Sequence, residues 1–188
     1  MQLLENGEIE TQSGRRASQH YVELSAFINY LNDNNVTSYL ELGARQGDTF
    51  YEVMRSLPKG SKGVAVDLPE GPWGGRGSRK ALKETIAMLD DYDVTAIFGD
   101  TSKVVDRVKE LGPFDAVFID ADHRYEAVKR DFDNYGENIV AFHDIAAEGC
   151  VCGSYKVGAP QFWKEVRKDY VEFIHPSTRP MGIGVMKC

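Results

Sequence analysis

The sequence PFDAVFIDADHRY, residues 113–125, begins with a mostly apolar run that ends abruptly in Asp120, Asp122 and His123. An apolar run bounded by turn residues, such as residues 114–119, is typical of a strand that is buried on both faces of a parallel sheet. In open sheets of this kind, ligands bind beyond the carboxyl ends of the strands. We therefore expect the two acids and the histidine to lie where chemistry takes place.

The composition indicates one well-packed domain. The chain has 188 residues, of which 42% are hydrophobic and 27% are charged. This length is sufficient for one hydrophobic core and short for two. We expect residues 1–188 to form a single domain, in which residues 1–35 supply an N-terminal helical cover.

Charge and apolar pattern argue against two classes of partner. Nucleic acid requires a basic face, which the net charge of −7 does not favour. No apolar run is long enough to span a bilayer, and the first ten residues lack the apolar core of a signal peptide. Three cysteines without zinc-type spacing fit a reducing compartment. We therefore predict a cytoplasmic protein that binds neither nucleic acid nor membrane.

Strand and helix signals alternate along the chain. Apolar residues at helical spacing predict an amphipathic helix at residues 17–32. Five strands are expected after it, with helices between and after them, at residues 37–42, 62–67, 94–98, 114–119 and 138–142. Two further strands, at residues 171–174 and 182–186, are joined too briefly for a parallel crossover and must be antiparallel. The pattern predicts an α/β, doubly wound, Rossmann-like fold: a seven-stranded, mostly parallel sheet with an antiparallel C-terminal hairpin and helices on both faces.

The turn after the first expected strand has features of a cofactor site. Gly43 and Gly47 lack side chains, so a ligand can approach the backbone at the helix N-terminus. Asp67 ends the next strand 20 residues after Gly47, a spacing at which a carboxylate can accept both hydroxyls of a ribose. Glu41 precedes the glycines and could meet an ammonium group.

The third expected strand ends in Asp100, which could accept a hydrogen bond from an adenine amino group. A ribose acceptor, an adenine acceptor and carboxylates near a cationic tail match a pyrophosphate poorly. They match S-adenosylmethionine well.

These residues resemble a known family. The resemblance is to class I S-adenosylmethionine-dependent methyltransferases, from about residue 37 onward, and its motifs are Glu41-x-Gly43-x-x-x-Gly47, Asp67, Gly99-Asp100, the strand ending at Asp120 and the terminal hairpin. A finer resemblance is to the group of macrolide-sugar O-methyltransferases and cephalosporin-hydroxylase-like proteins. It is carried by residues 118–132, 142–144, 160–163 and 182–185.

The resemblance implies roles for individual residues. Those implied to bind S-adenosylmethionine are Glu41, Gly43, Gly47, Asp67, Asp100, Thr101 and Asp120. In that group, acids ending strands four and five hold a divalent metal, and a histidine three residues after the first aspartate is the base. Asp120, His143 and Asp144 would then hold Mg²⁺, and His123 and Asp120 would be catalytic. His143 stands where the sugar enzymes carry a glutamate.

The metal also has an argument from the residues alone. If strands four and five are neighbours, Asp120 and Asp144 lie on chains about 4.8 Å apart and need a cation or a proton between them. Mg²⁺ suits such carboxylates. However, successive strand residues point to opposite faces, so His143 and Asp144 can both face an ion only if the strand has ended.

Simpler roles remain open for several of these residues. The carboxylates could bind the cofactor or cap helices, and we expect Asp122 to be the N-cap of the following helix. His123 could be a solvent-exposed residue of the first helical turn.

The predicted function is O-methylation of a hydroxyl on a small polar molecule, such as a sugar or glycoside. Two glycine-rich loops, residues 69–77 and 146–158, are expected to cover this acceptor. A nicotinamide-dependent oxidoreductase is the alternative, although residues 43–47 lack GxGxxG. A non-catalytic S-adenosylmethionine-binding protein is another. The N-terminal helix and the terminal hairpin are candidate contacts of a homo-oligomer.

Overall fold

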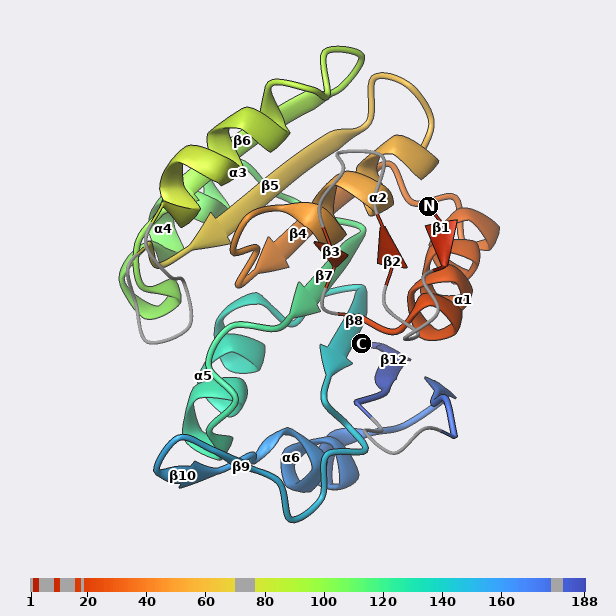
Figure 1. Ribbon diagram of the computed structural model, residues 1–188, viewed down its shortest axis with the longest axis vertical. Coiled ribbons are helices and arrows are strands. Elements are labelled where there is room, and N and C mark those ends of the chain that lie inside the picture. Colours follow the sequence, from red (N-terminus) through yellow and green to blue (C-terminus); the bar gives the residue numbers. More distant parts are fainter. Residues whose placement is uncertain (1, 4–8, 11–15, 18, 70–76, 177–180) are drawn as a thin grey trace.

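The computed structural model describes residues 2–3, 9–10, 16–17, 19–69, 77–176 and 181–188. Its main sheet contains β4 (Ser38–Leu42), β5 (Lys62–Asp67), β6 (Asp93–Phe98), β7 (Ala116–Ile119), β8 (Ile139–His143), β11 (Tyr170–Phe173) and β12 (Ile183–Lys187). These strands lie in the order β11-β12-β8-β7-β4-β5-β6 (Figure 1). Strands β4 to β8 are parallel, and β12 runs antiparallel between β8 and β11. The predicted doubly wound fold with an antiparallel terminal hairpin is confirmed.

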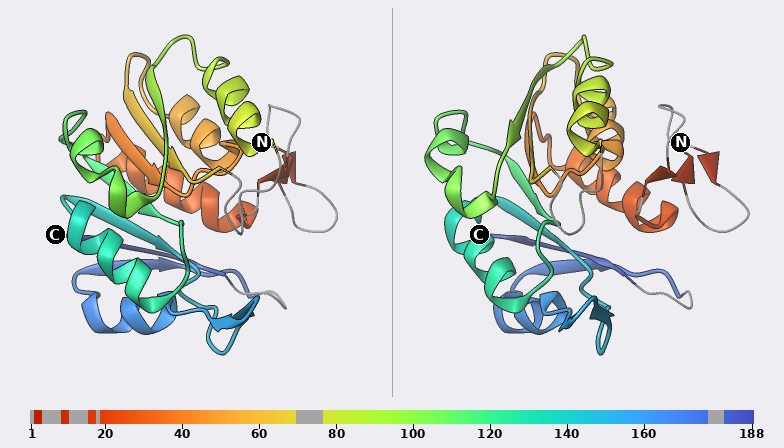
Figure 2. Two further views of the ribbon diagram at one scale, coloured as in Figure 1. Left: turned by 90° about the vertical axis from the view of Figure 1, so that its left-hand side faces the viewer. Right: turned by 60° about the vertical axis from the view of Figure 1, so that its left-hand side comes forward.

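Helices cover both faces of this sheet (Figure 2). One buried cluster joins α1 (Tyr21–Asp33), α2 (Asp48–Ser56) and α3 (Ser78–Ile86) to strand residues such as Tyr39 and Phe118. The other joins α4 (Val105–Lys109), α5 (Tyr125–Tyr135) and α6 (Ala159–Val166) to strand residues such as Leu40 and Val117. Because side chains alternate along a strand, the apolar runs of the central strands serve both clusters.

Strand register brings the predicted site residues into one row. Leu42 of β4 pairs with Ile119 of β7, and Ile119 in turn pairs with Phe142 of β8. The residues that follow these positions therefore emerge together at the carboxyl end of the sheet. On the other side of β4, Asp67 pairs with Phe98, which extends the row to β6.

The N-terminal region differs from the predicted helical cover. Helix α1 begins at Tyr21 rather than at residue 17, because β3 (Arg16–Ala17) pairs in a small antiparallel sheet with β2 (Ile9–Glu10), which also pairs with β1 (Gln2–Leu3). Pairing of such short segments depends on distant neighbours, which helical periodicity does not report.

The two loops that we expected to cover the acceptor have different outcomes. One contains a short hairpin, and the other is described only in part. Residues 146–158 contain a short hairpin of β9 (Val151–Cys152) and β10 (Tyr155–Lys156), in which Gly153 adopts φ +62°. Residues 70–76 of the other loop lie outside the described residues. Within the part that is described, no helix has the length and apolar composition needed to cross a membrane.

Candidate functional site

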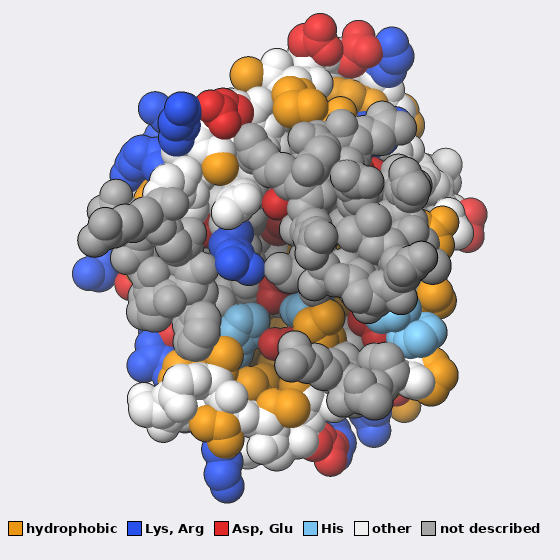
Figure 3. Space-filling view, viewed as in Figure 1, with side chains coloured by type: hydrophobic (Ala, Val, Ile, Leu, Met, Phe, Trp, Pro, Cys, Tyr) orange, Lys and Arg blue, Asp and Glu red, His pale blue; other side chains and the backbone are white. Residues whose placement is uncertain are grey.

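A cavity of about 860 Å³ opens at the carboxyl ends of the parallel strands. A volume in this range is typical of sites for cofactor-sized ligands. On the face shown in Figure 3, histidine and acidic side chains meet in a hollow near the centre. The predicted site residues among those that line the cavity are Glu41, Gly43, Asp67, Asp100, Thr101, Asp120, His123, His143 and Asp144.

The two glycines of the first turn have different roles. Gly43 adopts φ +92°, and a Cβ atom there would lie 2.1 Å from the carbonyl oxygen of Asp120. The missing side chain therefore lets the ends of β4 and β7 approach each other. Gly47 adopts φ +86° and does not line the cavity; a Cβ atom there would lie 2.7 Å from Cδ1 of Leu82 on α3. Gly47 shapes the turn and the packing of α2 on α3.

Asp67 retains an acceptor that no neighbour uses. Its Oδ1 accepts a hydrogen bond of 3.0 Å from the backbone N–H of Arg45. Its Oδ2 is buried and has no hydrogen-bond partner among the described residues. Burial raises the pKa of Asp67, although the N–H and the charge of Arg45 oppose this effect. A ligand hydroxyl at this position would satisfy the buried oxygen, so Asp67 fits the predicted ribose contact.

Glu41 is a buried carboxyl at the same end of the cavity. Its Oε2 accepts a hydrogen bond of 2.7 Å from the hydroxyl of Tyr39. Burial, together with the charges of Asp120 and Asp48, raises the pKa of Glu41 to about 8, against the lowering effect of the Tyr39 hydrogen bond. A ligand cation would favour the ionised form. Glu41 therefore fits the predicted ammonium contact.

Asp100 is partly used inside the protein. Its Oδ1 accepts hydrogen bonds from the backbone N–H of Ser102 at 2.9 Å and from the Ser102 hydroxyl at 2.6 Å. These hydrogen bonds cap the short 3₁₀ helix η1 (Thr101–Lys103) and lower the pKa of Asp100. Among the described residues no hydrogen bond occupies the second oxygen, Oδ2, which suits the predicted adenine contact.

Two histidine–aspartate pairs lie at the ends of β7 and β8. His123 Nδ1 lies 3.0 Å from Asp144 Oδ2, and His143 Nδ1 lies 3.0 Å from Asp120 Oδ1. His143 Nδ1 also lies 3.5 Å from Asp144 Oδ1. Both His143 and Asp144 face the cavity because β8 ends at His143 and Asp144 adopts φ +61°, which breaks the strand alternation. His143 and Asp144 therefore lie on one side, as the metal prediction required.

The carboxylates raise the pKa values of both histidines. Burial lowers the pKa of His123, but the hydrogen bond to Asp144 and the charges of Asp120 and Asp144 outweigh it, so the pKa is raised. Burial also lowers the pKa of His143, but the charges of Asp120 and Asp144 and the hydrogen bond to Asp120 outweigh this effect and raise the pKa to about 9. At neutral pH His143 is therefore a cation between two carboxylates.

The predicted Mg²⁺ ligands come together, but as ion pairs. A protonated imidazole has only donors and must lose its proton before it can bind a metal. His143 lies between Asp120 and Asp144, where the ion would lie. Among the described residues, no group of three or more His, Cys, Asp or Glu side chains is arranged to hold a metal. As they stand, these residues do not fit the predicted three-ligand Mg²⁺ site.

Gln19 is a site residue that the sequence did not reveal. It lies just before α1, is 4% exposed and lines the cavity. Its Nε2 donates a hydrogen bond of 2.8 Å to Asp120 Oδ2, and its Oε1 accepts one from the Thr49 hydroxyl. No local motif marks a glutamine in this position, and only its hydrogen bond to Asp120, just after β7, reveals it.

Asp122 is not the helix N-cap that we expected. Helix α5 begins at Tyr125, and its N-cap is Arg124. Asp122 lies two residues before this N-cap, so its Oδ1 instead accepts the N–H of Arg124 at 3.0 Å, and the carboxylate pairs with the Arg124 guanidinium. The Cζ atom of the Arg124 guanidinium also lies 5.7 Å from the ring centroid of Tyr155. This contact holds the β9–β10 hairpin at the cavity.

Comparisons with known proteins agree with this fold. A family model described as a methyltransferase domain matches residues 40–145, more than half of the chain. The comparison with curated protein sequences found no match. Among solved structures, an O-methyltransferase from Bacillus cereus in complex with SAH has a TM-score of 0.68 at 16% identity, covering 91% of this chain and 83% of that chain.

Two other solved structures give similar values. The O-methyltransferase TomG from Streptomyces achromogenes, involved in tomaymycin synthesis and in complex with SAM, has a TM-score of 0.67 at 17% identity, covering 90% of this chain and 80% of that chain. A methyltransferase from Geobacter sulfurreducens has a TM-score of 0.59 at 14% identity, covering 88% and 78%. At such identities, these similarities show the shared fold.

Proposed function

The chain belongs to the methyltransferase domain family, and from this premise we propose that it transfers a methyl group from S-adenosylmethionine to a hydroxyl of a small polar molecule. One observation carries the proposal. The same cavity contains a carboxylate oxygen of Asp67 without a hydrogen-bond partner and, elsewhere on its wall, the His123–Asp144 pair. The similar structures from Bacillus cereus and Streptomyces achromogenes hold SAH and SAM, which supports this cofactor.

The cofactor end of the cavity is defined by three acceptors. Asp67 Oδ2 would accept from the ribose, Asp100 Oδ2 from the adenine amino group, and Glu41 would face the ammonium. When bound, S-adenosylmethionine supplies an electrophilic methyl group. The protein contributes by holding the two reactants together and by excluding water, which removes much of the entropic cost of their encounter.

His123 is suited to remove the hydroxyl proton. Its Nδ1 faces Asp144 Oδ2 at 3.0 Å, so when Nδ1 carries the proton, Nε2 is left as the acceptor. Asp144 thus orients the imidazole and stabilises its charge after proton transfer, as the aspartate does in a catalytic triad. This role replaces the metal contact predicted for Asp144.

Asp120 has its carboxylate oxygens occupied by Gln19 and His143. We propose that it positions His143 rather than removing a proton itself. The His143 cation balances Asp120 and Asp144, so no step requires the predicted Mg²⁺.

The acceptor end is lined by polar groups, which supports a hydroxylated acceptor such as a sugar or glycoside. His123, Arg124 and Ser154 contribute to this wall. The side chains of Arg124 and Ser154 can hydrogen-bond hydroxyls that are not methylated.

The test begins with binding. Titration calorimetry should show binding of S-adenosylhomocysteine and none of NAD, and binding of NAD alone would support the oxidoreductase alternative. A panel of sugars and glycosides, assayed by formation of S-adenosylhomocysteine, then identifies an acceptor. Failure of every acceptor would favour a non-catalytic binding protein.

The base is tested with the acceptor so found. His123→Ala should lower kcat by about 10²–10⁴-fold, the usual contribution of a general base, and leave the affinity for S-adenosylhomocysteine unchanged. Asp144→Asn keeps the shape but loses the charge, so it should lower kcat less. Near-normal turnover in His123→Ala would refute the assignment.

A further inference from the structure

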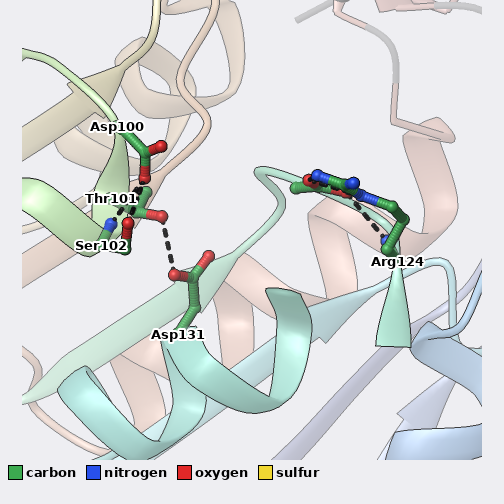
Figure 4. Close-up of polar contacts among 6 residues, drawn as sticks. Asp100, Thr101, Ser102, Arg124 and Asp131 are labelled. Carbon is green, nitrogen blue, oxygen red and sulfur yellow. Dashed lines mark hydrogen bonds and ion pairs between the residues drawn. The ribbon is translucent and has the colours of Figure 1, made fainter. Parts of the chain in front are cut away.

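Thr101 lies at the cavity wall and is held from behind by helix α5. Its Oγ1 hydroxyl donates a hydrogen bond of 2.7 Å to Asp131 Oδ1. Its carbonyl oxygen accepts a hydrogen bond from the hydroxyl of Tyr135, one turn further along α5. Figure 4 shows Asp131 rising from α5 towards Thr101, with Asp100 and Ser102 beside Thr101. Two separate contacts therefore fix this residue.

The contact with Asp131 determines what Thr101 can offer a ligand. A threonine hydroxyl has one hydrogen to donate and lone pairs to accept. An ionised carboxylate only accepts, so the single hydrogen of Thr101 must point at Asp131. Any ligand atom that reaches the Thr101 hydroxyl from the cavity therefore meets an acceptor.

Asp100 offers a ligand the same polarity. Its Oδ1 is engaged by Ser102, and its other carboxylate oxygen is also an acceptor. Asp100 and Thr101 both line the cavity, and this wall thus favours a ligand edge that donates hydrogen bonds. A carbonyl oxygen placed there would face two acceptors and lose its hydrogen bonds to water, which is a strong basis for rejection.

Holding Thr101 in place does not by itself explain why a carboxylate is buried at position 131. The residue is 0% exposed and does not line the cavity, and its Oδ2 has no hydrogen-bond partner within the described ranges. Leaving a buried charged oxygen unpaired destabilises a protein, and a neutral asparagine could hold Thr101 at a lower cost. What an asparagine cannot do is restrict the Thr101 hydroxyl to one polarity, because an amide both donates and accepts.

The charge of Asp131 is compatible with this role at neutral pH. Burial raises its pKa to about 6, while the Thr101 hydrogen bond and the charge of Arg130 on the same helix oppose the rise. Asp100, beside Thr101, and Asp122, in the loop before α5, add to the rise. The carboxylate is therefore ionised above that pH.

We propose that Asp131 is a positioning residue that makes the cofactor site select a purine with an amino group over its 6-oxo counterpart, acting through the hydroxyl of Thr101. The inference rests on the proposed function, since the purine is that of S-adenosylmethionine. It adds a residue that does not touch the cofactor.

Titration calorimetry with two ligands tests the proposal. S-adenosylhomocysteine carries the 6-amino group, and S-inosylhomocysteine carries a 6-oxo group in its place. The wild-type protein should bind the amino form more tightly. Asp131→Asn should keep the fold and reduce the ratio of the two affinities by about five- to tenfold, the effect of about one hydrogen bond.

Thr101 supplies the matched variants. Thr101→Ser retains the hydroxyl and should behave as wild type, whereas Thr101→Val removes it and should reduce the ratio. The double variant Thr101→Val with Asp131→Asn should match Thr101→Val alone, because both changes act through one group.

The outcomes separate this inference from the proposed function. A wild-type ratio in Asp131→Asn, or a double variant whose ratio falls by the product of the two single effects, would refute the role of Asp131 while leaving the methyltransferase proposal intact. Absence of S-adenosylhomocysteine binding to the wild-type protein would refute both.

Discussion

Replacement of Gly43 by alanine tests the close approach of β4 and β7 on which the cavity depends. The backbone of Gly43 has φ +92°, and a Cβ atom would lie 2.1 Å from the carbonyl oxygen of Asp120 and 2.6 Å from Cα of Ala121. An ordinary contact of this kind is about 3.5 Å, so the Asp120 backbone would have to withdraw by more than about 1 Å. It is not free to do so, because its N–H donates to the carbonyl of Leu42 at 2.9 Å.

The size of the effect follows from two contributions. A left-handed backbone costs a residue with a Cβ atom about 1–2 kcal/mol. Overpacking costs a further 1–3 kcal/mol or so. We therefore expect Gly43→Ala to lower the free energy of unfolding by about 2–5 kcal/mol. Because the shift moves the Asp120 carboxylate, it should also weaken S-adenosylhomocysteine binding by tenfold or more.

Gly60 provides a matched control. Its backbone has φ +82°, yet no atom lies within 4 Å of a Cβ placed there. Gly60→Ala should therefore show the backbone contribution alone, about 1–2 kcal/mol, with unchanged ligand affinity. Urea denaturation measures the free energies of unfolding, and calorimetry measures binding. If Gly43→Ala is no less stable than Gly60→Ala and binds the ligand equally well, the reasoning about this turn is wrong.

Four other predictions concern the charges of the site. Since the pKa of His123 is raised above 6.5 and the neutral form is the base, the rate should fall as the pH drops through a value above 6.5, and Asp144→Asn should move that limb of the pH–rate profile to lower pH. Glu41, with a pKa of about 8, is protonated at pH 7, so a bound ammonium should release its proton; calorimetry in buffers of different ionisation enthalpy should detect the release, and Glu41→Gln should abolish it. The same raised pKa means that Glu41 reduces the stability of the ligand-free protein as the pH rises from about 4.5 to 8, and a flat wild-type profile compared with Glu41→Gln would contradict this. Mg²⁺ should not raise the melting temperature of the wild-type protein but should raise that of His143→Glu, in which a carboxylate replaces the cation between Asp120 and Asp144. Equal responses of the two proteins, or loss of wild-type activity with EDTA, would support the predicted Mg²⁺ site instead.

The architecture and much of the site were accessible from local sequence. Apolar runs located every strand of the main sheet, and β5 (Lys62–Asp67) was placed at both ends, because a strand buried on two faces needs a continuous apolar segment. Acids that end or follow such runs, among them Asp67 and Asp120, lie at one sheet edge for the same reason. The local sequence pattern did not show which partners these acids contact.

Tertiary structure alone decided how these side chains are paired. Gln19 meets Asp120 across 101 positions of the chain, and Thr101 meets Asp131 across 30, separations that no periodicity records. The left-handed backbone of Asp144 placed His143 and Asp144 on one side, where a strand would have separated them, and there they form two histidine–aspartate pairs with His123 and Asp120. Sequence determines which residues reach the edge of the sheet, through burial of the strands that precede them. Hydrogen bonds and charges between distant segments determine what those residues can do there, because these interactions depend on distances of a few ångströms that exist only after folding.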